Sequence, residues 1–343
     1  MDIFAILSRY SYGDKMRDQI RNNASVSGVT VILSVFTLLF GFLCALFGEL
    51  AFPLYTASLA ALFLYDKNSK RIVSVLIPIA SVAINLLMGS PVPTAVVFAI
   101  PAALVLSIMY KKGLSKGECA GYITAISTVM IVVGVFALAM VAIREFSISG
   151  AVEYFGKIYD TLVKEFMNYL EQAASLSQNQ GIAAGFDEET VRTLFGSLVL
   201  VIPSVVVIAA FLITGLTAKV FTFIVSRFSD RPDFAVNWRF STGNLYAYFY
   251  IAVVLLSSLA GASDILGIAL ANIRNVFMIV YAYIGFNYVH YVISRSRSSF
   301  FATAVLIAAI LALSSFALSL LSFIGVYFTV VKNKTLQGIE KDK

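Results

Sequence analysis

The chain has 343 residues, of which 59% are hydrophobic and only 13% are charged. A soluble globular protein has about 45–50% apolar and about 25% charged residues, so a buried core alone does not explain this composition. The net charge of +6 does not indicate nucleic acid binding, because Lys and Arg stand in short clusters between apolar runs, as membrane topology signals do.

The apolar runs are continuous and about 17–30 residues long, which is enough to cross a bilayer as helices. A transmembrane barrel would instead show segments of about ten residues that alternate apolar and polar side chains. In lipid every backbone polar group must be paired inside the protein, and helices achieve this. The sequence therefore predicts an all-α polytopic transmembrane bundle with about nine or ten spans.

An N-terminal five-span bundle is predicted at 26–143. It follows a cytoplasmic lead-in at 1–25, which is compatible with a short interfacial helix and with a frayed terminus. Glycines recur every four residues at the start of the fifth span, a pattern that lets helix backbones approach closely. We expect that contact within the chain rather than between two copies. The five spans run at about 26–47, 50–65, 72–88, 94–110 and 118–143, and the glycines are Gly113, Gly117 and Gly121.

The composition changes at 144–192, which carries eight acidic and four basic side chains. Apolar residues at helical spacing predict an extracytoplasmic amphipathic helix at about 151–176. This helix is expected to cap the bundle, shield a cavity or meet an external partner. Asp187 is placed as the N-cap of a long span that reaches about Ser226, and Pro203 should kink that span.

A C-terminal membrane bundle is predicted at 193–331, with a cytoplasmic basic tail at 332–343. Beyond the long span, further spans are expected at about 244–260 and 266–293. The last uncharged run, 300–331, would be about 48 Å long as one helix, whereas the hydrocarbon core is about 30 Å thick. It is therefore either a strongly tilted helix or a hairpin that turns near Ser314 and Ser315.

The basic residues predict the orientation of the chain. With the N-terminus in the cytoplasm, only four basic residues lie clearly outside, all of them in the acidic segment, and this is a strong positive-inside bias. The basic tail also prefers the inside, which favours the hairpin and ten spans over nine. The four external basic residues are Arg144, Lys157, Lys164 and Arg192.

No catalytic signature is present in the sequence: there is no phosphate-binding loop, no HExxH and no paired CxxC. The chain has one histidine, His290, so a multi-histidine metal site is excluded. Cys44 and Cys119 lack the spacing of a metal site and are expected to be small buried side chains rather than a disulfide. We therefore expect no enzyme, no cofactor and no metal.

Polar residues at membrane depth are the remaining candidates, because they are costly there and often functional. Arg274 lies about two turns inside its span and would contact an anion or headgroup in a cavity; alternatively it snorkels, or it pairs with Asp264 or Glu49. Asn85 is also compatible with hydrogen bonding to a neighbouring helix, and His290 with interfacial packing. The candidate substrate-binding residues are Asn272, Arg274, Asn275, Asn85 and Glu49, and the candidate proton relay is His290.

Three features of the second half resemble the YybS-like family of predicted bacterial multi-pass membrane proteins, a domain of unknown function. They are the acidic segment that runs into the span with Pro203, the loop Phe234–Phe240, and Asn275 followed by Tyr283–Tyr291. The family's Gly-x-x-Asp stretch is not preserved, since Gly325–Phe328 has no acid. The resemblance implies a bacterial inner-membrane protein and a distant kinship of the first half with substrate-binding subunits of energy-coupling-factor transporters. It supplies no functional residues.

Two functions remain open. The first is small-molecule binding or transport through a cavity within the bundle, covered by the outer amphipathic helix. The alternative is a structural or regulatory membrane scaffold that acts through protein partners. The partners expected are the lipid bilayer, a small molecule, and a membrane protein or a second copy of the chain, but not nucleic acid.

Overall fold

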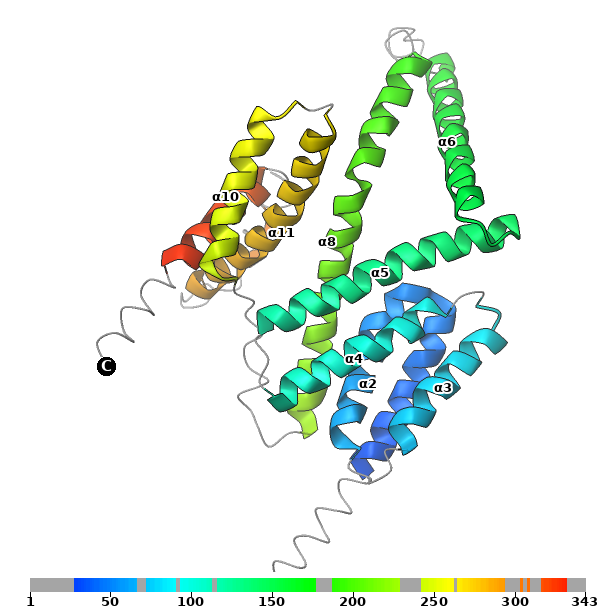
Figure 1. Cartoon of the computed structure of the whole chain (residues 1–343), viewed down its shortest axis with the longest axis vertical. Coiled ribbons are helices and arrows are strands. Elements are labelled where there is room, and N and C mark those ends of the chain that lie inside the picture. Colours follow the sequence, from blue (N-terminus) through cyan, green and yellow to red (C-terminus); the bar gives the residue numbers. More distant parts are fainter. Residues whose placement is uncertain are drawn as a thin grey trace, which may run out of the picture. The chain divides into compact units, whose positions relative to one another are not determined.

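The computed structural model describes residues 28–66, 72–90, 93–112, 116–176, 187–228, 242–261, 264–293, 303–304, 307–308 and 316–331. All regular elements in these ranges are helices (Figure 1), which confirms the all-α membrane class predicted from the sequence. The lead-in at 1–25, the loop Phe234–Phe240, the basic tail and the turn near Ser314 lie outside these ranges, so their predicted structures remain predictions.

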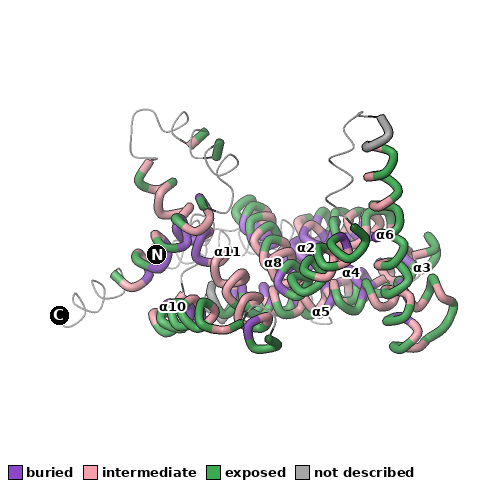
Figure 2. Tube along the Cα trace, turned by 90° about the horizontal axis from the view of Figure 1, so that it is seen from above, coloured by how far each residue is buried: buried purple, intermediate pink, exposed green. Residues whose placement is uncertain are grey.

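Five helical stretches of the described chain are long and apolar enough to cross a bilayer, and three shorter helices are also apolar. Many large apolar side chains of these helices are exposed. Exposed residues recur along the helices (Figure 2). In the five long stretches, only 17–50% of the most apolar window is buried inside the protein. Such a surface is stable in lipid but not in water, as a membrane-spanning bundle requires.

The first long stretch, Gly28–Tyr65, is a helical hairpin rather than one span. A helix at 28–47 ends at Gly48, whose φ of +56° suits glycine, and a 3-10 turn, η1 (Gly48–Ala51), leads into α2 (Phe52–Tyr65). The hydroxyl of Thr30 donates a hydrogen bond to the carbonyl of Tyr65 at 3.2 Å, so the two open ends meet. The first two predicted spans are therefore separate helices.

The next three helices agree with the predicted spans: α3 (Ile72–Leu87), α4 (Thr94–Lys112) and α5 (Lys116–Ile143). The turn after α3 contains Gly89, with φ of +80°. At the other end of α3, the buried carboxylate of Asp66 accepts hydrogen bonds from the peptide N–H and the hydroxyl of Ser74, at 3.0 and 2.6 Å. A carboxylate at a helix N-terminus satisfies donors that the helix leaves free.

The chain folds into two compact units, each described here by itself. Unit 1 comprises 1–134 and 212–238, and unit 2 comprises 135–211 and 239–343, so α5 and α8 (Glu188–Phe228) each contribute to both. The core of unit 1 packs large side chains such as Phe52, Tyr55 and Phe221, which are fully buried. Cys44 and Cys119 are free thiols in that core, as predicted.

Unit 2 contains the amphipathic helix α6 (Ile148–Leu176), which confirms the amphipathic helix predicted between the fifth and sixth spans. It forms a hairpin with the start of α8 (Figure 1), where Val163 and Val191 are fully buried and Phe166 meets Phe195 edge-to-face. Asp187 accepts a hydrogen bond from the peptide N–H of Thr190 at 2.8 Å and is therefore the predicted N-cap of α8.

The C-terminal part of unit 2 contains α10 (Asn244–Leu259), α11 (Ile265–Ile293) and a helix at Phe316–Val331. The last two helices cross with direct backbone contact at Gly285 and Gly325. A Cβ added to Gly285 would collide with the carbonyl oxygen of Leu321, and one added to Gly325 with that of Tyr281. Only glycine permits backbones to approach this closely.

The close contact expected within the chain at the Gly113–Gly121 repeat is not found at Gly121 among the described residues, and a contact between two copies stays a prediction. A Cβ added to Gly121 would meet no described atom within 4 Å, so no helix backbone presses against it. The four-residue spacing of glycines shows where a helix could be approached closely. It does not show whether another helix packs there. The reciprocal pair Gly285 and Gly325 has no comparable repeat in its own helix.

Candidate functional site

Two of the predicted site residues lie in unit 1 and are engaged in packing. Asn85 is 1% exposed, and its amide donates hydrogen bonds to the carbonyl of Gly41 at 2.8 Å and of Ser81 at 2.9 Å. Asn85 thereby joins α3 to the helix at 28–47. Glu49 accepts a hydrogen bond from the hydroxyl of Thr94 at 3.0 Å, so it joins η1 to α4. No hydrogen bond connects Asn85 with Glu49 in the described part of unit 1.

The side-chain amide of Asn272, in unit 2, forms hydrogen bonds with the backbone of α8. Its nitrogen donates to the carbonyls of Leu200 at 2.8 Å and Ile268 at 3.0 Å, and its oxygen accepts from the peptide N–H of Ser204 at 3.0 Å. Leu200 and Ser204 flank Pro203 and are normally hydrogen-bonded to each other in a helix. Asn272 therefore ties α11 to the backbone of α8 beside Pro203.

The other predicted residues of α11 do not converge on one centre. Arg274 and Asn275 are half-buried, and Arg274 forms no ion pair with Asp264 or with another described carboxylate of unit 2. His290 is exposed near the end of the helix, where its ring stacks on Phe286 with centroids 6.1 Å apart. Their proposed roles in substrate binding and proton relay stay predictions.

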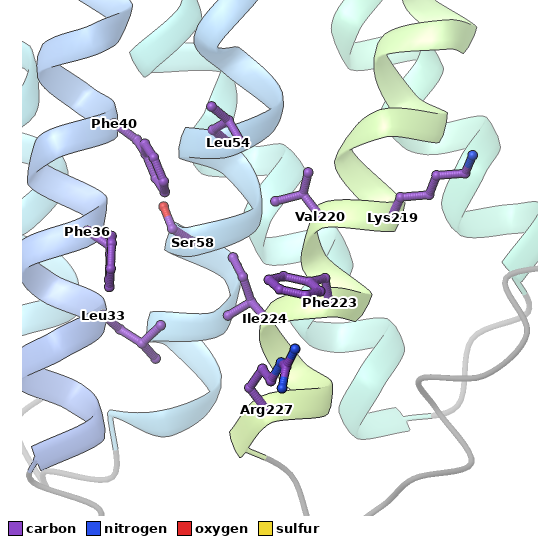
Figure 3. A pocket seen from close by; sticks show the side chains of 10 residues that line it. All are labelled: Leu33, Phe36, Phe40, Leu54, Ser58, Lys219, Val220, Phe223, Ile224 and Arg227. Carbon is purple, nitrogen blue, oxygen red and sulfur yellow. The ribbon is translucent and has the colours of Figure 1, made fainter.

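A pocket of about 500 Å³ lies in unit 1, between the helix at 28–47, α2 and the C-terminal part of α8 (Figure 3). Small-molecule sites typically have volumes of about 300–1,000 Å³. The first helix contributes Leu33, Phe36 and Phe40, and α2 contributes Leu54 and Ser58. The hydroxyl of Ser58 is bonded to the carbonyl of Tyr55 at 2.9 Å, so this wall offers mainly apolar surface.

The α8 wall adds three apolar side chains and two cations. Arg227 and Leu33 lie at one end of the pocket, and Phe40 and Leu54 lie at the other (Figure 3). The guanidinium of Arg227 stands over the ring of Phe223 at 5.2 Å from its centroid. Lys219 lies at the rim, and its side chain extends from α8 away from the first helix (Figure 3). The apolar residues of this wall are Val220, Phe223 and Ile224.

None of the predicted site residues lines this pocket. Lys219 was not among the predicted residues, although the sequence contains a signal for it: Lys219 is the single charged residue between Arg192 and Arg227. An isolated charge inside a long apolar run is unusual, because membrane-spanning helices seldom retain one without a role. The apolar wall had no such signal, since Phe36, Phe40 and Leu54 resemble any lipid-facing residue in sequence.

Comparison with known protein families assigns the chain to a membrane protein family. The family model described as "Predicted membrane protein (DUF2232)" matches residues 28–327. The chain belongs to this family. The match confirms the resemblance that the second half indicated, and it extends over both units of this DUF2232 protein. No curated protein and no solved structure matches the chain.

Proposed function

We propose that this DUF2232 protein binds a membrane-soluble small molecule with an apolar chain in the pocket of unit 1. The observation that carries the proposal is the lining: eight of the ten side chains around about 500 Å³ are uncharged, and seven of them are hydrocarbon side chains. An apolar lining of this kind accommodates the hydrocarbon part of a ligand. Binding rather than catalysis is proposed, because no acid–base pair lines the pocket.

The surroundings of the pocket support entry from the bilayer. Phe36 is 48% exposed and Phe223 is 61% exposed, so the pocket opens at the side of the bundle. Neighbouring positions on these helices, such as Val35, Leu39 and Leu216, are exposed apolar residues that suit contact with lipid. A water-soluble ligand would have to cross this apolar surface, whereas a lipid-soluble one moves along it.

We also propose a bacterial inner-membrane location with the N-terminus in the cytoplasm, on the positive-inside distribution of Lys and Arg. In that orientation the helix at 28–47 runs outward and α8 runs inward. The end of the pocket at Arg227 and Leu33 then faces the cytoplasmic surface. The molecule would therefore be taken from the cytoplasmic leaflet.

Binding of 1-oleoylglycerol, a neutral amphiphile, tests this function with the full chain in detergent. Leu54→Trp should fill the pocket and abolish the ligand-induced rise in melting temperature. Leu39→Trp is the matched control, because Leu39 is 48% exposed and does not line the pocket. Equal responses of both variants, or no binding by the unchanged chain, would contradict the proposal.

An exposed apolar strip on α6 favours the scaffold alternative. Ile158, Leu162 and Tyr169 are 39%, 47% and 66% exposed, although neighbouring residues of α6 pack on α8. A photo-crosslinking residue at Leu162 should give a discrete protein adduct that is absent when the same residue replaces Lys157 on the charged side. Adducts to lipid alone would remove this alternative.

A further inference from the structure

We infer that the molecule bound in the pocket carries an anionic headgroup, a phosphate or carboxylate, which Arg227 binds at the cytoplasmic end. The inference rests on the proposed function and names the ligand class, an anionic single-chain or double-chain lipid. Two cations and no acid line the pocket. Neither Lys219 nor Arg227 forms an ion pair with a described carboxylate. Among the described residues, no carboxylate neutralises the positive charge of the site.

The geometry of Arg227 suits an anion. The guanidinium carbon of Arg227 lies over the ring of Phe223, 5.2 Å from the ring centroid. Cation–π stacking uses the face of this planar group and leaves its N–H edge available. That edge matches phosphate and carboxylate oxygens in bidentate fashion. Phe223 therefore stabilises the position of Arg227 at the pocket end by a cation–π contact.

Lys219 places a second positive charge at the rim of the pocket. It lies eight residues before Arg227, about 12 Å along the axis of α8. With Arg227 near the cytoplasmic surface, this distance places the Cα of Lys219 well inside the hydrocarbon layer. A lysine at that depth is costly unless it snorkels or meets an anion. Because its side chain extends away from the first helix (Figure 3), its long flexible stem would have to turn toward the pocket to meet the anion of an acidic ligand there.

The apolar wall fits the remainder of such a molecule. From Arg227 the pocket continues between α8 and the first helix toward Phe40 and Leu54 (Figure 3). Val220 and Arg227 are about 10.5 Å apart along the helix axis, so there is room for the first part of an acyl chain behind the headgroup. A headgroup at the membrane surface with its chain directed inward is the normal arrangement of a lipid.

Two probes that differ by one phosphate test the inference: 1-oleoylglycerol and 1-oleoylglycerol 3-phosphate. The phosphate ester should bind the unchanged chain at least about tenfold more tightly, as expected of charge-assisted hydrogen bonds. Arg227→Gln should remove this preference while the affinity for 1-oleoylglycerol stays, and Lys219→Gln should reduce the preference. Lys111→Gln is the matched control, because Lys111 is a basic residue of unit 1 outside the pocket. Its preference should be unchanged.

The outcomes separate the inference from the proposed function. If both probes bind equally and the Gln variants change nothing, the anionic headgroup is excluded while the pocket function stands. If neither probe binds, both fail. Stabilisation by inorganic phosphate alone, to the same extent as by the phosphate ester, would indicate a soluble anion and overturn the lipid assignment. If Lys111→Gln lost the preference for the phosphate ester to the same extent, the preference would depend on the overall charge of the protein. That result would also contradict binding of the headgroup by Arg227.

Discussion

The side-chain oxygen of Asn272 in α11 accepts a hydrogen bond from the peptide N–H of Ser204 in α8 at 3.0 Å. The same amide donates to the carbonyl of Leu200 at 2.8 Å, so it binds both members of one i, i+4 backbone pair beside Pro203. In lipid no water is present to satisfy these groups. Asn272 therefore ties α11 to the backbone of α8 next to the proline in the middle of that helix.

The first prediction is a coupling between Asn272 and Pro203. Asn272→Leu should lower the free energy of unfolding by about 0.6–2 kcal/mol, the range of side-chain hydrogen bonds in membrane helices. With Pro203→Ala, α8 can close its own backbone bonds, so the cost of Asn272→Leu should fall. Thermal or denaturant unfolding of the four chains in one detergent gives the coupling. Additive effects would show that Asn272 does not serve the proline.

The second prediction concerns the crossing of α11 with the helix at Phe316–Val331. Gly285→Ala should destabilise the protein by about 1–3 kcal/mol, because the new methyl group overlaps the backbone carbonyl of Leu321. Gly121→Ala is the matched control: its methyl group meets no described atom within 4 Å, and alanine favours a helix by about 1 kcal/mol over glycine. Equal destabilisation of the two variants would contradict the crossing.

The third prediction concerns the hairpin of α6 and α8. Arg192 donates to Asp160 of α6 and to Glu188 of its own helix, each at 2.9 Å. Arg192→Gln should increase hydrogen exchange along α6 only slightly, because exposed ion pairs contribute little to stability. The difference should shrink in high salt, which screens exposed charges.

Lys157→Gln provides the control for that measurement. Lys157 pairs with Glu153 at 2.8 Å inside α6, and both side chains are about 70% exposed. Loss of this pair should leave the exchange of α6 unchanged, because it does not connect α6 to α8. A larger effect at Lys157 than at Arg192 would mean that the hairpin does not depend on the Arg192 contacts.

The helices were predictable from the sequence because each one has a local signal. The apolar runs, the turn at Gly89 and the N-cap at Asp187 are properties of neighbouring residues. In lipid a long apolar run has to be a helix, so composition decides the secondary structure. The amphipathic period of α6 also follows from its own residues.

The contacts between helices were not predictable in this way. Asn272 was expected at a ligand, whereas its amide serves the backbone of α8 at Leu200 and Ser204. That role depends on the partner helix facing Asn272, which residue spacing within α11 does not determine. The pocket could not be predicted for the same reason. The helix at 28–47 and α8 are far apart in the sequence and come together only in the folded chain.

The last prediction tests the sidedness on which the leaflet assignment depends. With the N-terminus in the cytoplasm, Leu50, Phe146 and Leu259 all lie on the outer side, and they are 82%, 91% and 84% exposed. Cysteine at each of these positions should react with a membrane-impermeant maleimide added to intact cells. Cysteine in place of Lys111, at the cytoplasmic end of α4, should react only after the membrane is opened.

The native thiols do not interfere with this labelling, because Cys44 and Cys119 are buried in the core of unit 1. The three outer positions follow different spans, so agreement among them fixes the direction of the helix at 28–47, α5 and α10 together. Labelling of Lys111→Cys in intact cells, with protection of Leu50→Cys, would invert the chain. The Arg227 end of the pocket would then face outward, and the ligand would come from the outer leaflet, because the positive-inside bias would have failed for this protein.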